Sequence, residues 1–161
     1  MCIRDSSETN LGFTGGNNFL FRKLLKNSDA DFFFLLNADT EIDRDCIKHL
    51  VEFMRTDPQT GIVEAIQEPK EHPKWYNPTT FETGWCSGGG MLIRREALEQ
   101  TGLFDPRFFL YCEDVDLSWR MWLHRWKCKI NPKAKYTHYT CLLYTSPSPR
   151  DRTRSRMPSS A

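Results

Sequence analysis

An apolar run that follows Asp31 and ends at Leu36 constrains this chain more than any other feature of its sequence. It contains only phenylalanine and leucine, so it predicts a strand over residues 31–36 that is buried on both faces. We expect that strand to lie in a parallel sheet. Helices predicted over residues 19–26 and 43–55 alternate with it and with a strand predicted over residues 61–66. This order is typical of an α/β fold.

Polar and acidic residues follow the predicted strand directly, at Asn37, Asp39 and Glu41. Open α/β sheets place their ligands beyond the carboxyl ends of strands. If the strand continues, Asn37 and Asp39 point the same way, and such oxygen ligands suit Mg²⁺ or Mn²⁺ beside a diphosphate. The alternative is that these residues only cap the next helix. Asp43 is placed to supply that cap, which leaves Asp39 free.

A second acidic cluster contains Glu113, Asp114 and Asp116 and follows the aromatic run at residues 108–111. Residues 117–123 have the pattern of an amphipathic helix, so the acids fall in its first turn, where free N–H groups and the helix dipole favour negative charge. One interpretation is that they only start and solvate the helix. The other is that acids at the edge of a packed aromatic wall include a general base.

Glycines mark two further segments. Gly15 and Gly16 predict a turn before the first helix, with a spacing that fits neither a P-loop nor a dinucleotide fingerprint and favours a plain loop. Gly88 and Gly89 precede a strand predicted over residues 91–93, and indicate a backbone pressed against a substrate or a neighbouring element. Arg94 follows that strand and either faces phosphate or serves as a cap or ion-pair partner.

The remaining pattern predicts a short helix over residues 96–100 and two strands, 127–130 and 135–139, with a turn at residues 131–132 between them. The pattern gives no reason to make any histidine a ligand, because a lone histidine is more often structural. We interpret three histidines as structural or surface residues: His49, His72 and His124.

Composition excludes several classes of function. A length of 161 residues suits one domain, and a formal charge of +1 gives no electrostatic case for binding nucleic acid. No apolar run approaches the length of a membrane span, and no signal peptide is evident. The six cysteines form no C-x-x-C pair, so we expect free thiols in a reducing compartment, the cytoplasm.

The two ends differ from the middle. We expect residues 1–7 to be a non-native, disordered leader and residues 141–161, rich in Ser, Pro and Arg, to be a disordered tail. Both resemble translated sequencing-adaptor read-through, which predicts that the native protein continues beyond each junction. Residues 8–140 are then the domain.

Five blocks in order resemble a family 2 glycosyltransferase of the GT-A fold, especially its rhamnosyltransferase-like members. They are N-L-G-F-T-G-G-N-N at residues 10–18, L-L-N-A-D-T at 35–40, S-G-G-G-M-L-I-R-R at 87–95, G-L-F-D-P-R-F-F-L-Y-C-E-D-V-D-L at 102–117, and P-x-A-x-Y-x-H ending at His138. Each block alone is weak, and the five together are specific.

The resemblance implies transfer of a sugar from a nucleotide diphosphate to a hydroxyl acceptor with inversion at the anomeric carbon. It makes Asp114 the catalytic base, with Glu113 beside it. It also makes Asp39 a ligand of Mn²⁺ or Mg²⁺, and His138 a residue that can complete the coordination shell of that metal. Asn37 stands where the family's metal motif usually begins with an acid.

Three more assignments follow from the same likeness. The donor side includes Asn10, Gly15 and Gly16 together with Asn37 and Asp39, and the acceptor side includes Gly88, Gly89 and Arg94. The acceptor is a glycan or lipid-linked glycan in cell-surface polysaccharide synthesis, which places the parent protein in the cytoplasm or at the inner face of the membrane, peripheral through parts outside this chain.

Two departures limit these expectations. Arg125 stands where the family usually has glycine, and the family's first βαβ unit, which grips the base, precedes the first block and is absent. We therefore expect a fragment with a partial GT-A fold and little or no activity by itself. The alternatives are a non-catalytic domain that binds a glycan or partner, and another nucleotide-sugar enzyme with similar acids.

Overall fold

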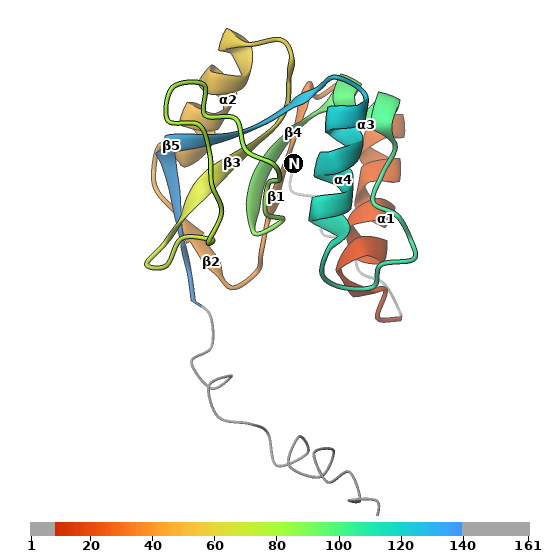
Figure 1. Cartoon of the computed structure of the whole chain (residues 1–161). Coiled ribbons are helices and arrows are strands. Elements are labelled where there is room, and N and C mark those ends of the chain that lie inside the picture. The colour runs from red at the N-terminus through yellow and green to blue at the C-terminus, as the bar shows by residue number, and fades with distance from the viewer. Residues whose placement is uncertain (1–8, 140–161) are drawn as a thin grey trace, which may run out of the picture.

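The computed structural model describes residues 9–139, which form one mixed β-sheet with helices on both faces (Figure 1). The elements in chain order are α1 (Gly12–Asn27), β1 (Phe32–Leu36), β2 (Thr40–Ile42), α2 (Cys46–Thr56), β3 (Thr60–Glu68), β4 (Gly90–Arg94), α3 (Arg95–Thr101), α4 (Glu113–Leu123) and β5 (Lys127–His138). The strands lie in the order β1-β4-β3-β5-β2. The predicted leader and tail lie outside the described residues.

Two apolar clusters, one on each face, hold the helices to the sheet. Phe21 of α1, Leu98 of α3 and Leu117 of α4 belong to the first cluster, and Leu50 and Met54 of α2 belong to the second. Figure 1 shows α2 on one side of the sheet and the other three helices on the opposite side.

Alternation along the strands explains their continuous apolar sequences. Ile62 of β3 enters the first cluster and its neighbour Val63 the second, because successive side chains point to opposite faces. In β1, Phe33 is in the first cluster while Phe32 packs against the second. Both faces of the sheet are therefore buried, as the sequence predicts.

The expected parallel direction of β1 is wrong. β1 pairs with β4 in antiparallel register, from Phe32 opposite Arg94 to Leu36 opposite Gly90. Among the described strands only β3 and β5 run parallel to each other. The apolar run predicts burial on both faces, and helices on both faces bury a strand in either direction.

The last two predicted strands are one. β5 continues through Asn131 and Pro132. Its pairing with β3 shifts register there: Ala65 lies opposite Asn131, and the next residue, Ile66, lies opposite Lys135. Proline lacks the N–H needed for the ladder, and an irregularity of this kind is where a sheet tolerates it.

The predicted glycine turn is also wrong, because α1 begins at Gly12 and Gly15 and Gly16 lie inside it. Tertiary contacts fix this early start. The amide of Asn18 donates to the Phe104 carbonyl at 2.8 Å, and Asn18 Oδ1 accepts from the Phe104 N–H at 3.1 Å. The predicted position of Glu113, Asp114 and Asp116 is confirmed, because all three lie in the first turn of α4.

Candidate active site

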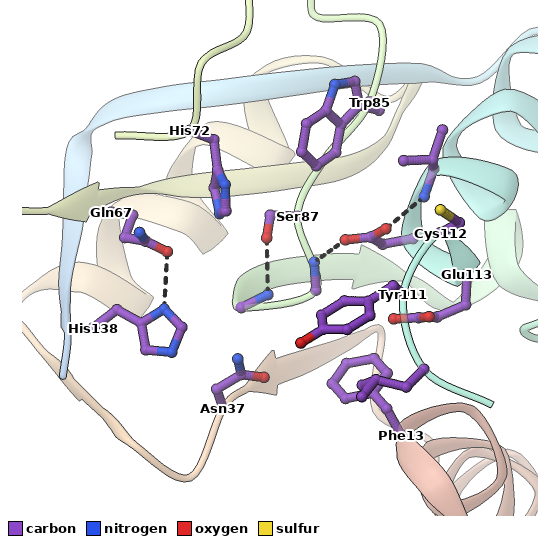
Figure 2. A pocket seen from close by; sticks show the side chains of 15 residues that line it. Phe13, Asn37, Gln67, His72, Trp85, Ser87, Tyr111, Cys112, Glu113 and His138 are labelled. Atoms are coloured by element: carbon purple, nitrogen blue, oxygen red, sulfur yellow. Dashed lines mark hydrogen bonds between the residues drawn. The ribbon is translucent and has the colours of Figure 1, made fainter. Parts of the chain in front are cut away.

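A cavity of about 340 Å³ opens where β1, β3 and β5 end and where β4 begins. Asn37 lines it just beyond β1, Gln67 near the end of β3, and His138 at the end of β5. Asp114 lines it from the first turn of α4. Figure 2 shows the side chains of Asn37, Gln67 and His138 converging from separate elements on one space.

Two backbone N–H groups hold the carboxylate of Asp114. Gly88 donates to Oδ2 at 3.0 Å and Val115 donates to Oδ1 at 2.8 Å (Figure 2). A carboxylate has about four acceptor positions, so these two bonds fix its orientation and leave capacity for a hydroxyl from the cavity. The geometry suits a general base.

The residues just before Asp114 carry unusual backbone strain. Tyr111 and Cys112, which both line the cavity, have φ angles of 70° and 69°. Left-handed backbone is uncommon for residues other than glycine, and such outliers cluster at functional sites.

Glu113 is buried, and its Oε2 atom has no hydrogen-bond partner among the described residues. Burial raises the pKa of Glu113, and the negative charge of Asp114 adds to the rise, while a backbone N–H opposes it. Glu113 lines the same cavity as Asp114. The two adjacent acids therefore sit in different environments, one held by two N–H groups and one buried without a partner at Oε2.

The three consecutive glycines that lead into β4, the last of which is its first residue, are required by close contacts with neighbouring side chains. A Cβ atom on Gly88 would lie 2.9 Å from Phe13 Cζ, and one on Gly89 would lie 2.7 Å from the Tyr136 hydroxyl oxygen. Gly90 is equally tight, at 2.7 Å from Tyr136 Cε1. This supports the interpretation of a neighbouring element, and it brings the Gly88 N–H to Asp114.

Asp39 and His138 meet at the far side of the cavity. His138 Nε2 lies 3.1 Å from Asp39 Oδ1, and His138 Nδ1 lies 3.0 Å from Gln67 Oε1. Because Gln67 Oε1 also accepts from the Tyr136 hydroxyl at 3.2 Å, it acts as an acceptor for the His138 ring N–H. Nε2 and Oδ1 are then two lone-pair donors that face each other, an arrangement that requires a proton or a cation between them.

Asp39 lies in a turn after β1, where the chain does not continue as a strand. Asn37 is fixed there by its N–H, which donates to the Gly89 carbonyl at 3.1 Å, and by its carbonyl, which accepts from the Thr40 hydroxyl. The predicted helix cap differs: α2 begins at Cys46, and Asp43 accepts the Cys46 N–H through its backbone carbonyl.

Five of the predicted site residues are not among those that line the cavity, and one of them, Asp39, is joined to it through its contact with His138. Arg94 is at the opposite end of β4, where its guanidinium donates to the carbonyls of Thr60 and Met54 at 2.9 and 2.7 Å. The predicted assignment of Arg94 to the acceptor side is therefore wrong, because these bonds keep its charge away from the site. Gly15 and Gly16 are inside α1, and Asn10 accepts the Gly12 N–H at 2.9 Å before it. Of residues 10–18, Phe13 is the one that lines the cavity.

Several residues outside the predicted set line the cavity or lie behind it. Glu64 of β3 is buried, pairs with Lys74 and accepts the Ser87 N–H at 2.8 Å. His72, interpreted from sequence as structural or surface, lines the cavity. An acid inside the apolar sequence of β3 is the one sequence signal that pointed toward this cluster.

Residues 6–118 match the family model described as glycosyl transferase family 2. The chain belongs to this family. Over 72 residues it is 40% identical to the N-acetylglucosaminyl-diphospho-decaprenol L-rhamnosyltransferase of Mycobacterium tuberculosis (strain ATCC 25618 / H37Rv), a match that covers 45% of this chain and 20% of the relative. Over 77 residues it is 35% identical to rhamnosyltransferase WbbL of Escherichia coli (strain K12), covering 48% and 28%. The chain thus spans less than a third of either relative.

The fold of this family 2 chain is the predicted α/β GT-A fold. The described structure resembles that of GalNAc-T7 with UDP, GalNAc and Mn²⁺, with a TM-score of 0.67 and 15% identity over 82% of this chain and 31% of that one. At this identity the likeness shows the fold alone. No helix within residues 9–139 is long and apolar enough to cross a membrane.

Proposed function

We propose that this chain carries the catalytic and metal-binding part of an inverting glycosyltransferase that moves a sugar from a nucleotide diphosphate to a hydroxyl acceptor. The observation that carries the proposal is the convergence of Asp114 and His138 on one cavity, with Asp39 bonded to His138. Such a displacement needs a proton acceptor near the attacking hydroxyl and groups that hold a cation near the leaving diphosphate. Asp114 supplies the first, and the Asp39–His138 pair supplies the second.

In this proposal the acceptor oxygen attacks the anomeric carbon from the Asp114 side. The new carbon–oxygen bond forms as the bond to the diphosphate oxygen breaks, and that electron pair leaves with the diphosphate. The hydroxyl proton passes to Asp114, whose carboxylate the Gly88 and Val115 N–H groups orient. General-base assistance of this kind contributes about 10²–10⁴-fold.

The residues at the other end fit a divalent cation. Asp39 Oδ1 and His138 Nε2 are the facing lone-pair donors, and the Asp39 side chain is 58% exposed and open to further ligands. No group of three or more such side chains gathers within residues 9–139, so diphosphate oxygens and water would complete the shell. A bound cation would neutralise charge on the leaving diphosphate, and an imidazole ligand favours Mn²⁺ over Mg²⁺.

The acceptor class comes from the relatives. The mycobacterial relative is named for a diphospho-decaprenol glycan acceptor and for transfer of L-rhamnose. We accordingly include a lipid-linked glycan in the proposal for this chain, with a role in cell-surface polysaccharide synthesis in the cytoplasm at the inner face of the membrane. The partial coverage of the relatives makes the full gene product the form to assay.

An assay of the full gene product with Mn²⁺, several nucleotide sugars and an undecaprenyl- or decaprenyl-linked N-acetylglucosamine acceptor tests the proposal. Asp114→Asn should lower transfer by about 10²-fold or more while nucleotide-sugar binding persists. Asp116→Asn is the matched control, because Asp116 pairs with Arg120 at 2.8 Å along α4. Equal transfer by wild type and Asp114→Asn would remove Asp114 as the base, and no transfer by the wild type would favour a binding domain.

A further inference from the structure

His72 reaches the cavity from the loop between β3 and β4 and is so far without a role. Its Nε2 atom is buried and has no hydrogen-bond partner among the described residues. A buried polar atom without a partner costs about 1–3 kcal/mol, so its retention calls for a ligand or another reason. Figure 2 shows the ring pointing into the cavity from the opposite side to Asn37.

Strong contacts keep the His72 loop in place. The ring packs edge-on against Trp85, with centroids 5.7 Å apart and planes at 61°. Two residues along, Lys74 pairs with the buried Glu64, lies 4.0 Å above the Trp85 ring and donates to the Trp85 carbonyl at 3.2 Å. The loop is therefore anchored to the sheet and to the segment that leads to Gly88, which makes His72 a preorganised group.

His72 lines the same cavity as Asp114 and His138, the residues at the two ends of the proposed site. If the diphosphate sits near His138 and the attacking hydroxyl near Asp114, the transferred sugar occupies the space between them. We propose that His72 Nε2 hydrogen-bonds a hydroxyl of that sugar and so contributes to donor-sugar selectivity. This inference rests on the proposed function.

The chemistry of the ring suits a hydroxyl better than a phosphate. Burial lowers the pKa of His72 and the nearby Lys74 charge lowers it further, while Asp114 opposes both. A neutral imidazole has one donor and one acceptor nitrogen, and a sugar hydroxyl can meet either.

Binding of nucleotide sugars to the full gene product, measured by calorimetry in Mn²⁺, tests this inference. The probes are dTDP-rhamnose, UDP-glucose and GDP-mannose, each compared with its bare nucleoside diphosphate. His72→Phe keeps an aromatic ring against Trp85 and removes the nitrogen. It should weaken the best-bound nucleotide sugar about tenfold, near the upper end for one neutral hydrogen bond, and leave the nucleoside diphosphate unchanged.

His72→Gln places an amide near the Nε2 position and should recover most of the loss, and His124→Phe, at an exposed position after α4, should change nothing. Equal weakening of sugar nucleotide and nucleoside diphosphate by His72→Phe, or no weakening of either, overturns the inference. If the wild type binds none of the probes, the proposed function fails and this inference with it.

A second measurement avoids variants that fold poorly. In wild-type protein with labelled histidines, the His72 ring signal, assigned by its absence in His72→Gln, should move further with the nucleotide sugar than with the nucleoside diphosphate alone. Identical spectra with the two ligands contradict a contact to the sugar.

Discussion

His138 Nε2 lies 3.1 Å from Asp39 Oδ1, although 99 positions separate the two residues in the chain. The contact forms because β2 and β5 pair antiparallel, with Thr40 opposite His138. The turn that carries Asp39 thereby comes to rest against the end of β5. The pairing of β2 with β5 therefore fixes the positions of these two residues relative to each other.

The Asp39–His138 pair predicts a measurable loss of metal affinity in Asp39→Asn. Even changes to groups that only support a metal ligand cost about 10–100-fold in affinity, so loss of a ligand should weaken Mn²⁺ binding by at least about tenfold. Calorimetric titration of MnCl₂ in the presence of a nucleoside diphosphate measures this. Asp45→Asn is the matched control, because Asp45 is exposed and its side chain makes no cap hydrogen bond to α2. Equal affinities for both variants and the wild type would show that the cation, if any, binds elsewhere.

Gly16→Ala should stabilise the protein. Gly16 lies inside α1, and a Cβ atom there would meet nothing within 4 Å. Alanine in a helix interior is favoured over glycine by about 0.5–1 kcal/mol, so the midpoint of urea denaturation should rise. Donor binding should not change, because the residue is not at the cavity. A loss of nucleotide binding in Gly16→Ala would restore the donor-side role that the sequence suggested.

The sequence predicted the elements better than their arrangement. The acids of α4 were placed in its first turn because a 3.6-residue period and an aromatic lead-in are local signals. The direction of β1 is not local: it depends on β4, which pairs with β1 more than 50 residues later in the chain. The continuation of β5 through Pro132 likewise depends on the register shift opposite Ala65.

The same distinction applies to the candidate site. Asn37 directly follows a strand and Asp114 lies at the start of a helix, which are local signals, whereas His138 was indicated only by the family resemblance. The structure brings all three to one cavity. Glu64 and His72 were not predicted as site residues. Glu64 pairs with Lys74 of the long loop between β3 and β4, His72 belongs to that loop, and the sequence does not specify the path of the loop. Arg94 was misplaced because β4 begins at the cavity and ends at Arg94, whose guanidinium is bound by carbonyls at that far end.

Gly90→Ala should destabilise the fold and disturb the cavity. A Cβ atom at Gly90 would lie 2.7 Å from Tyr136 Cε1, and Tyr136 is fully buried, so the ring has no free space to enter. Overpacking of this kind costs about 1–3 kcal/mol, which chemical denaturation measures. Gly84→Ala is the control, since a Cβ there meets nothing within 4 Å. Equal stability of the two variants would contradict the close packing of the glycine segment.

Glu64 predicts a pH-dependent stability. Burial raises the pKa of Glu64 from its ordinary 4.5 to about 7, and the Asp114 charge adds to this, while Lys74 and the Ser87 N–H oppose it. Between these two pH values the folded protein binds a proton that the unfolded chain has released. The contribution of Glu64 to stability therefore falls as the pH rises from about 4.5 to about 7. The fall should be roughly 1–3 kcal/mol.

Glu64→Gln removes this titration and keeps the shape of the side chain. The decisive quantity is the change in unfolding free energy between pH 5 and pH 8, compared between the two proteins, since the other titrating groups, including His72, contribute to both. We expect the wild type to lose more stability over that interval than Glu64→Gln. Glu68→Gln, which affects the more exposed pair with Lys135, should behave like the wild type. Parallel pH curves for wild type and Glu64→Gln would mean that Glu64 is already ionised in the folded protein at pH 5, held so by Lys74 against the cost of burial.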